Sequence, residues 1–140
     1  MSSTRQLLLI NPNTTSAVTE RLAQHLQPLM PAEVQLRLRT AAFGAPYIAN
    51  EASCAVAAHA VLQAWADQTG ADWGQVLSTS GAPKSPGVSD GLPGGMPNNM
   101  PATMPDGVLI GCFGDPGLFA LREACHCPVT GLAEASFIEA

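Results

Sequence analysis

Apolar and polar positions follow two periods along this chain, one typical of strands and one of helices. The apolar run QLLLI (6–10) is typical of a strand buried on both faces. From Val18 to Leu29, apolar residues recur at helical spacing until Pro28 and Pro31 interrupt the pattern. The run VQLRLRT (34–40) alternates between apolar and polar residues, which predicts a half-buried strand nearer an edge of the sheet.

From residue 51 onward the chain continues to alternate between predicted helices and strands. An alanine-rich run (51–69) predicts a helix that ends at Gly70, and GVLIGCF (107–113) predicts a third strand. LFALREAC (118–125) predicts a third helix, and PVTGLAEAS (128–136) predicts a fourth strand that runs into a helix started with the help of Ser136. The alternation of strands and helices indicates an α/β fold, a parallel sheet with helices on both faces.

Composition narrows the classes of partner. Of the 140 residues, 46% are hydrophobic and 12% charged, with a net charge of −5. The six Lys and Arg residues form no cluster, so we expect no nucleic-acid partner and no anionic membrane surface. The apolar stretch near the N-terminus, Leu7 to Ile10, is too short for a signal peptide or a membrane span, which favours a cytoplasmic protein.

One segment, 81–107, breaks the alternation. It contains six prolines and six glycines, so neither a helix nor a strand can propagate through it. A structureless segment of this length is unusual inside a compact domain. We expect a disordered Pro/Gly-rich insertion.

Four cysteines are candidates for chemistry: Cys54, Cys112, Cys125 and Cys127. In a reducing compartment they are expected as free thiols. The spacing of Cys125 and Cys127 is shorter than that of zinc knuckles, and no second Cys/His pair follows, so we expect no metal.

Cys112 stands where the third strand ends. Ligands of open parallel sheets bind beyond the carboxyl ends of the strands, where the segments 11–14 and 40–46 also lie. Asp115 is a candidate N-cap and Pro116 a candidate first residue of the next helix, whose N-terminus would favour a thiolate and a bound anionic oxygen. Position alone leaves a reactive thiol and a buried packing residue equally open.

The motifs LLLINPNTT, GVLIGCFGDPGLFALREA and CPVTGLAEAS resemble the hydantoin racemase branch of the aspartate/glutamate racemase superfamily. The resemblance covers 7–72 and 107–140 and leaves out the Pro/Gly-rich segment. It implies a flavodoxin-like half of a two-lobed fold and a cofactor-independent racemase or epimerase of hydantoins or related amino-acid derivatives. The site residues that it implies are catalytic Cys112 and, for substrate binding, Asn11, Pro46, Phe113 and Gly114.

In such enzymes one cysteine thiolate takes a proton from the substrate carbon and a second, opposed thiol returns one from the other side. Here 1–140 is expected to be a single, incomplete lobe, with the second lobe and its cysteine absent. Cys54, Cys125 and Cys127 are not placed to oppose Cys112.

Whether the chain is an enzyme therefore stays open at this stage. It is a racemase of small molecules, able to form a homo-oligomer, or a truncated or mispredicted non-catalytic remnant of one. A further alternative is a single-cysteine decarboxylase or lyase of the same superfamily.

Overall fold

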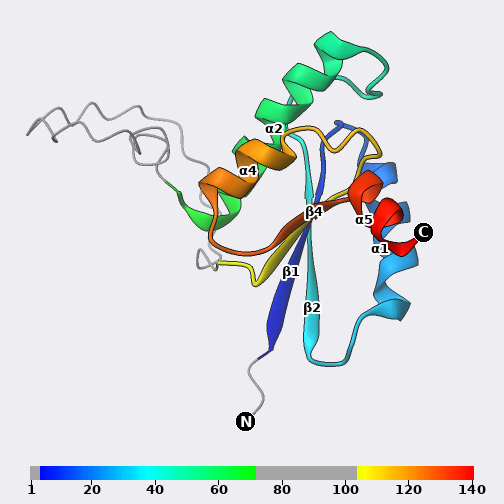
Figure 1. Ribbon diagram of the computed structural model, residues 1–140, viewed down its shortest axis with the longest axis vertical. Helices are drawn as coiled ribbons and strands as arrows, with labels where there is room; N and C mark the ends of the chain where they lie inside the picture. Colours follow the sequence, from blue (N-terminus) through cyan, green and yellow to red (C-terminus); the bar gives the residue numbers. More distant parts are fainter. Residues whose placement is uncertain (1–3, 72–103) are drawn as a thin grey trace, which may run out of the picture.

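A computed structural model describes residues 4–71 and 104–140 (Figure 1). The elements along the chain are β1 (Arg5–Asn11), α1 (Ser16–Leu26), the 3-10 turn η1 (Gln27–Leu29), β2 (Val34–Thr40), α2 (Glu51–Thr69), β3 (Gly107–Ile110), α4 (Leu118–Ala124), β4 (Val129–Gly131) and α5 (Leu132–Glu139). Of the expected insertion at 81–107, residues 81–103 lie outside the described residues. Gly107, its last residue, belongs to β3.

The four strands form one parallel sheet in the order β2-β1-β3-β4. This is the flavodoxin-like order, with β2 at an edge, so the predicted fold class and edge strand are confirmed. In the register, Ile10 of β1 lies beside Arg39 of β2 and Ile110 of β3, and Ile110 lies beside Gly131 of β4. The carboxyl ends of all four strands therefore meet at one edge of the sheet.

Helices cover both faces, with α2 and α4 on one side and α1 on the other (Figure 1). The larger core lies under α2 and α4, because alternate buried side chains of β1 and β3 point there. It is formed by buried residues of the two strands and the two helices, among them Leu8, Ile10, Val108, Ile110, Val61, Trp65 and Leu121.

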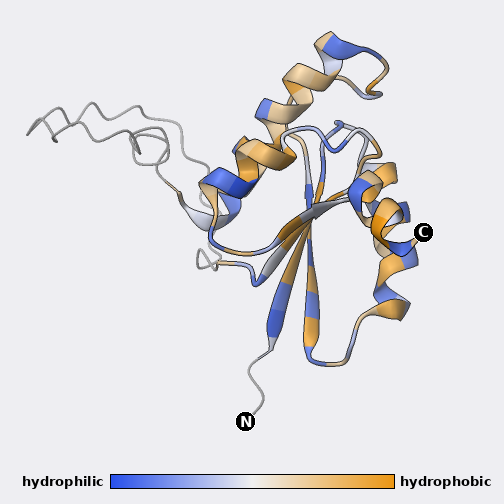
Figure 2. Cartoon of the chain, in the orientation of Figure 1, coloured by the Kyte–Doolittle hydropathy of each residue, from blue (hydrophilic) through white to orange (hydrophobic). Residues whose placement is uncertain are grey.

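The hydropathy pattern of β2 matches its edge position. Figure 2 shows β2 alternating between hydrophobic and hydrophilic residues, a pattern typical of an edge strand. The burial does not follow the alternation strictly, because Leu38 is exposed whereas Arg37 and Arg39 are half-buried. In the part of the chain that the structure describes, no helix is long and apolar enough to cross a membrane.

Both ends of α2 are fixed by its sequence. The Asn50 side chain accepts from the Ser53 N–H at 2.9 Å, and the Ser53 hydroxyl oxygen accepts from the Asn50 N–H at 3.1 Å, which is a capping box. Gly70, left-handed with φ 69°, ends the helix as predicted. Figure 1 shows that α2 starts beyond the carboxyl ends of the strands and runs back along the sheet.

A close backbone approach joins α2 to the loop after β3. Gly117 has φ 77°, and a Cβ placed on it would lie 2.9 Å from the carbonyl oxygen of Ala58 in α2. A side chain there would meet both an unfavourable backbone conformation and backbone atoms that cannot move aside. The packing of α2 against this loop therefore requires a glycine.

We predict that Gly117→Ala lowers the free energy of unfolding by about 2–4 kcal/mol, from left-handed strain plus overpacking. The control is Gly114→Ala, three residues away, where an added Cβ would have only the Cys112 sulfur within 4.0 Å. The control should change the free energy of unfolding by no more than about 0.5 kcal/mol. Urea unfolding measures both, and equal stability of the two variants would contradict the close approach.

Candidate active site

The strand order locates the place where a ligand would bind. From β1 the chain crosses to β2 on one side and later returns to β3 on the other, so the order reverses between β1 and β3. In open parallel sheets this switch point leaves a crevice beyond the strand ends, and ligands bind there. The two loops that flank it follow Asn11 of β1 and Ile110 of β3, and the second of them carries Cys112.

Asn11 organises the first of these loops from inside. Its side chain is fully buried. The Nδ2 group donates to the Asn13 side chain at 3.0 Å, the Thr15 carbonyl at 3.1 Å and the Thr19 hydroxyl at 3.0 Å, and Oδ1 accepts from the Asn13 N–H at 3.1 Å. These bonds hold 11–15 in one shape. The substrate-binding role implied for Asn11 stays a prediction, and in this structure its amide serves the loop.

Thr19 links this loop to the next strand. Its hydroxyl, buried in α1, lies 2.7 Å from the hydroxyl of Thr40 at the end of β2. Sequence reasoning missed both threonines. The only local signal is a threonine on the buried side of an otherwise apolar helix face, because a buried hydroxyl needs a partner.

The loop after β2 is joined to the first loop by backbone bonds. The Ala41 N–H donates to the Asn11 carbonyl at 2.9 Å, and the Thr14 N–H donates to the Ala45 carbonyl at 3.1 Å. Pro46 is exposed, and its carbonyl accepts from the Thr15 hydroxyl at 2.8 Å. The predicted meeting of 11–14 and 40–46 at one edge is confirmed. What is shown for Pro46 is a structural contact, and substrate binding by it remains a prediction.

Cys112 begins a tight turn. The Gly111 N–H donates to the Ile10 carbonyl at 2.8 Å, and the Asp115 N–H donates to the Cys112 carbonyl at 3.1 Å. The Cys112 side chain is half-buried, whereas Phe113 and Gly114 are exposed. Within residues 4–71 and 104–140, the N–H groups of Phe113 and Gly114 have no hydrogen-bond partner. A thiol and two free donors therefore lie together on one turn at the switch point.

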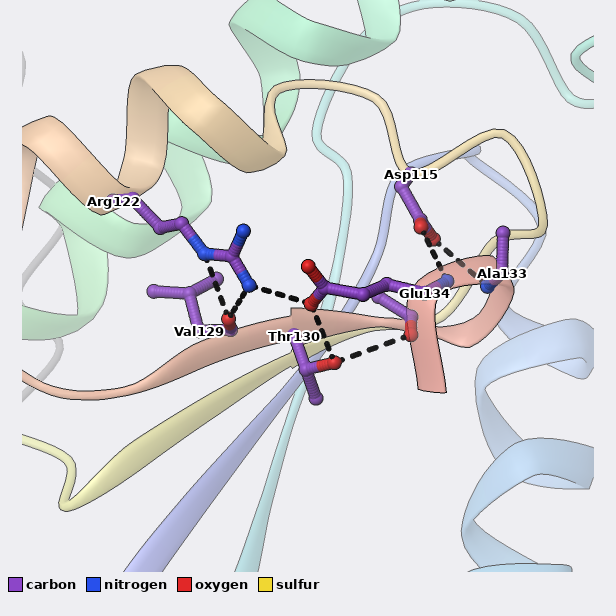
Figure 3. Close-up of polar contacts among 7 residues, drawn as sticks. Asp115, Arg122, Val129, Thr130, Ala133 and Glu134 are labelled. Atoms are coloured by element: carbon purple, nitrogen blue, oxygen red, sulfur yellow. Dashed lines mark hydrogen bonds and ion pairs between the residues drawn. The ribbon is translucent and has the colours of Figure 1, made fainter. Parts of the chain in front are cut away.

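Asp115 does not cap the helix that follows it. Helix α4 begins at Leu118, after Gly117 as its N-cap, so Asp115 as N-cap and Pro116 as first helical residue were wrong predictions. Asp115 has φ 43°, and its carboxylate accepts from the N–H groups of Ala133 at 3.1 Å and Glu134 at 2.8 Å (Figure 3). The residue caps α5, which starts directly after β4.

Ser136 likewise does not start α5. The helix begins at Leu132, and the Ser136 hydroxyl donates back to the Leu132 carbonyl at 2.6 Å. Both wrong predictions, Asp115 for α4 and Ser136 for α5, came from cap patterns that span only a few residues. The carboxylate that caps α5 belongs to Asp115, 18 residues before Ala133.

A second set of contacts holds the same junction (Figure 3). Arg122 of α4 donates to the Val129 carbonyl at 2.8 Å and to the Glu134 carboxylate at 2.5 Å, and the Thr130 hydroxyl lies 3.0 Å from that carboxylate. The hydrogen bonds from Arg122 and then from Thr130 hold the pKa of Glu134 below its usual value. Glu134 therefore stays ionised at neutral pH, and its contribution to this junction is lost only as pH falls through that lowered pKa.

The other cysteines lie in different surroundings. Cys54 is in the first turns of α2. Cys125 is buried at the opposite edge from Cys112, with its sulfur 3.8 Å from that of Cys127. Burial and then the neighbouring Cys127 raise the pKa of the Cys125 thiol to about 11. All four cysteines are free thiols.

A hollow of about 270 Å³ lies at the amino edge of the sheet, and its lining includes Arg5, Leu7, Met30 and Asp106. None of its lining residues is a cysteine, so it offers no group comparable to the Cys112 thiol.

A model of the Asp/Glu/hydantoin racemase family matches residues 7–140. The chain belongs to this family. The match includes the first loop, the Cys112 turn and the β4–α5 junction, and therefore every part of the candidate site.

Two solved structures resemble this family member. One is an allantoin racemase from Klebsiella pneumoniae, with 26% identity and a TM-score of 0.69 over 97% of this chain and 42% of that chain. The other is an allantoin racemase from Pseudomonas fluorescens, with 21% identity and a TM-score of 0.66 over 96% of this chain and 43% of that chain. At 21% identity the second supports the fold alone. No curated protein matches the sequence.

This family member spans about two fifths of the length of both comparison proteins. The described elements form one α/β sheet with its helices.

We predict that a thiol-alkylating reagent at neutral pH labels Cys112 first and Cys125 last. Cys112 is half-buried on a loop, whereas burial keeps the Cys125 thiol protonated until pH approaches about 11. Peptide mapping after a time course measures the order. Faster labelling of Cys125 or Cys127 than of Cys112 would contradict the assignment of the site.

Proposed function

We propose that this chain forms the catalytic-cysteine lobe of a cofactor-independent racemase or epimerase for 5-substituted hydantoins or related amino-acid derivatives. The observation that carries the proposal is the turn at the switch point. It carries the Cys112 thiol and the N–H groups of Phe113 and Gly114, which have no hydrogen-bond partner among the residues that the structure describes. Family membership supports a racemase of small molecules. The allantoin racemase from Klebsiella pneumoniae, at 26% identity, supports a hydantoin ring, because allantoin is itself a 5-substituted hydantoin.

The chemistry follows from these groups. The hydrogen on C5 of a hydantoin is acidic because C5 is next to a ring carbonyl, whose oxygen takes up the negative charge when the proton leaves. The Cys112 thiolate would accept that proton as a general base. N–H donors aimed at the carbonyl oxygen would stabilise the developing enolate, which is the contribution expected from Phe113 and Gly114.

Inversion needs a second proton donor on the opposite face of the ring. Among the other cysteines, Cys125 and Cys127 lie toward the amino edge of the sheet, and Cys54 lies in α2. The lobe is therefore proposed to perform one half of a two-base reaction, removal of the C5 proton, together with its return to the same face. Four free thiols fit the reducing cytoplasm, where we propose that the protein works.

We predict that the 140-residue chain exchanges the C5 hydrogen of 5-benzylhydantoin for deuterium at least tenfold faster than it racemises the compound. A missing opposed acid can cost about a hundredfold in the inversion step. Proton NMR in heavy water measures the exchange, and optical rotation measures the racemisation, both against a protein-free blank.

Cys112→Ala should reduce exchange to the blank, whereas Cys54→Ala, which removes a thiol outside the turn, should leave it intact. Exchange that survives in Cys112→Ala would overturn the assignment of the base. Racemisation as fast as exchange would show that a second acid is present and would contradict the single-lobe chemistry.

A further inference from the structure

The Asp115 carboxylate lies at the N-terminus of helix α5. The first turn of a helix presents free N–H groups and a partial positive charge, which together attract anions. In α5 these are the N–H groups of Ala133 and Glu134, and the Asp115 carboxylate accepts from both (Figure 3). The carboxylate of this chain thus takes the place that a substrate carboxylate could otherwise take.

The surroundings are built around that carboxylate. A Cβ on residue 131, at the end of β4, would overlap the Asp115 carboxyl group, so the glycine there leaves the space that the carboxyl fills. Asp115 adopts a left-handed backbone, which aspartate tolerates better than most residues. Its N–H closes the turn on the Cys112 carbonyl, so the charge stands one turn from the thiol.

No cation in the described loops offsets this charge. The segments 11–15, 41–50 and 111–117 contain neither Lys nor Arg. The nearby Arg122 is engaged by the Val129 carbonyl and Glu134, and Arg39 donates to Gln68 of α2 at 2.8 Å. Asp115 is the one charged residue in these three segments, so together they carry a net charge of −1.

The family name covers substrates of both kinds, the anionic amino acids aspartate and glutamate and the uncharged hydantoin ring. We propose that Asp115 is the specificity-determining residue that restricts this lobe to uncharged ring substrates. It fills the anion site of α5 and repels a second carboxylate from the same edge. The inference rests on the proposed function, since it assumes that the substrate binds beside Cys112.

The test compares two hydantoins that differ in charge. 5-Benzylhydantoin is neutral at pH 7, and hydantoin-5-propionate carries an ionised carboxylate. NMR titration of the ¹⁵N-labelled chain measures both dissociation constants without requiring turnover. Repulsion between two unit charges less than a Debye length apart predicts about tenfold weaker binding of the anionic compound to the unaltered chain.

In Asp115→Asn the anionic compound should gain affinity until the ratio of the two dissociation constants falls below about threefold. Asparagine keeps an acceptor for one α5 amide and tolerates the left-handed backbone, so the variant is expected to fold. The matched control is Glu139→Gln, which removes the same charge from the exposed last turn of α5 and should keep the tenfold ratio.

A ratio unchanged in Asp115→Asn, or equal binding of both compounds by the unaltered chain, would overturn the role of Asp115 and leave the proposed function intact. If the unaltered chain binds neither compound, the proposed hydantoin site is wrong, and the role of Asp115 falls with it.

Discussion

Two hydrogen bonds from the Asp115 carboxylate connect the turn that carries Cys112 to the start of α5. They join a turn after β3 to the junction after β4, across 18 residues of sequence. Strands β3 and β4 pair only through short segments, so the loops beyond them need a separate constraint. Asp115 supplies it, and the Arg122–Glu134 contacts hold the same junction from the side of α4.

The other flank of the switch point is held in a corresponding way. Asn11 fixes the loop after β1 from inside, as Asp115 fixes the loop after β3. Both polar side chains make hydrogen bonds within the protein. Among the described residues of this edge, Cys112 is half-buried, and Phe113 and Gly114 are exposed. Under the proposed function, Cys112 would be the base and the two N–H groups would be the donors for proton removal from a carbon acid. Return of a proton from the other face would need a second acid.

Much of the fold could be predicted from the sequence, because strand and helix periods are local properties. The continuous apolar run of β1, the alternation of β2 and the stop at Gly70 each reflect the environment of a few neighbouring residues. The edge position of β2 followed from its half-polar pattern. The place of Cys112 at a strand end also followed, since it needs only the end of an apolar run.

The site could be predicted only in part. Asp115 followed by Pro116 has the local pattern of a helix start, yet the carboxylate finds its partners in α5. That choice depends on the space left by Gly131 and on the approach of Gly117 to α2, both of which are tertiary contacts. The buried pair of Thr19 and Thr40 was missed for the same reason. The hydrogen bonds of Asn11 within its loop could not be predicted either, because a motif match does not distinguish a residue that contacts substrate from one that contacts its own loop.

The most direct test of this account is amide hydrogen exchange at Ala133 and Glu134. If the Asp115 carboxylate holds the start of α5, both N–H groups exchange slowly in the unaltered chain, although first-turn amides of a helix normally exchange fast. In Asp115→Ala both should exchange at least tenfold faster, while the amides of Leu8 and Ile10 in the central strand stay protected. Fast exchange of Ala133 and Glu134 in the unaltered chain would contradict the central claim.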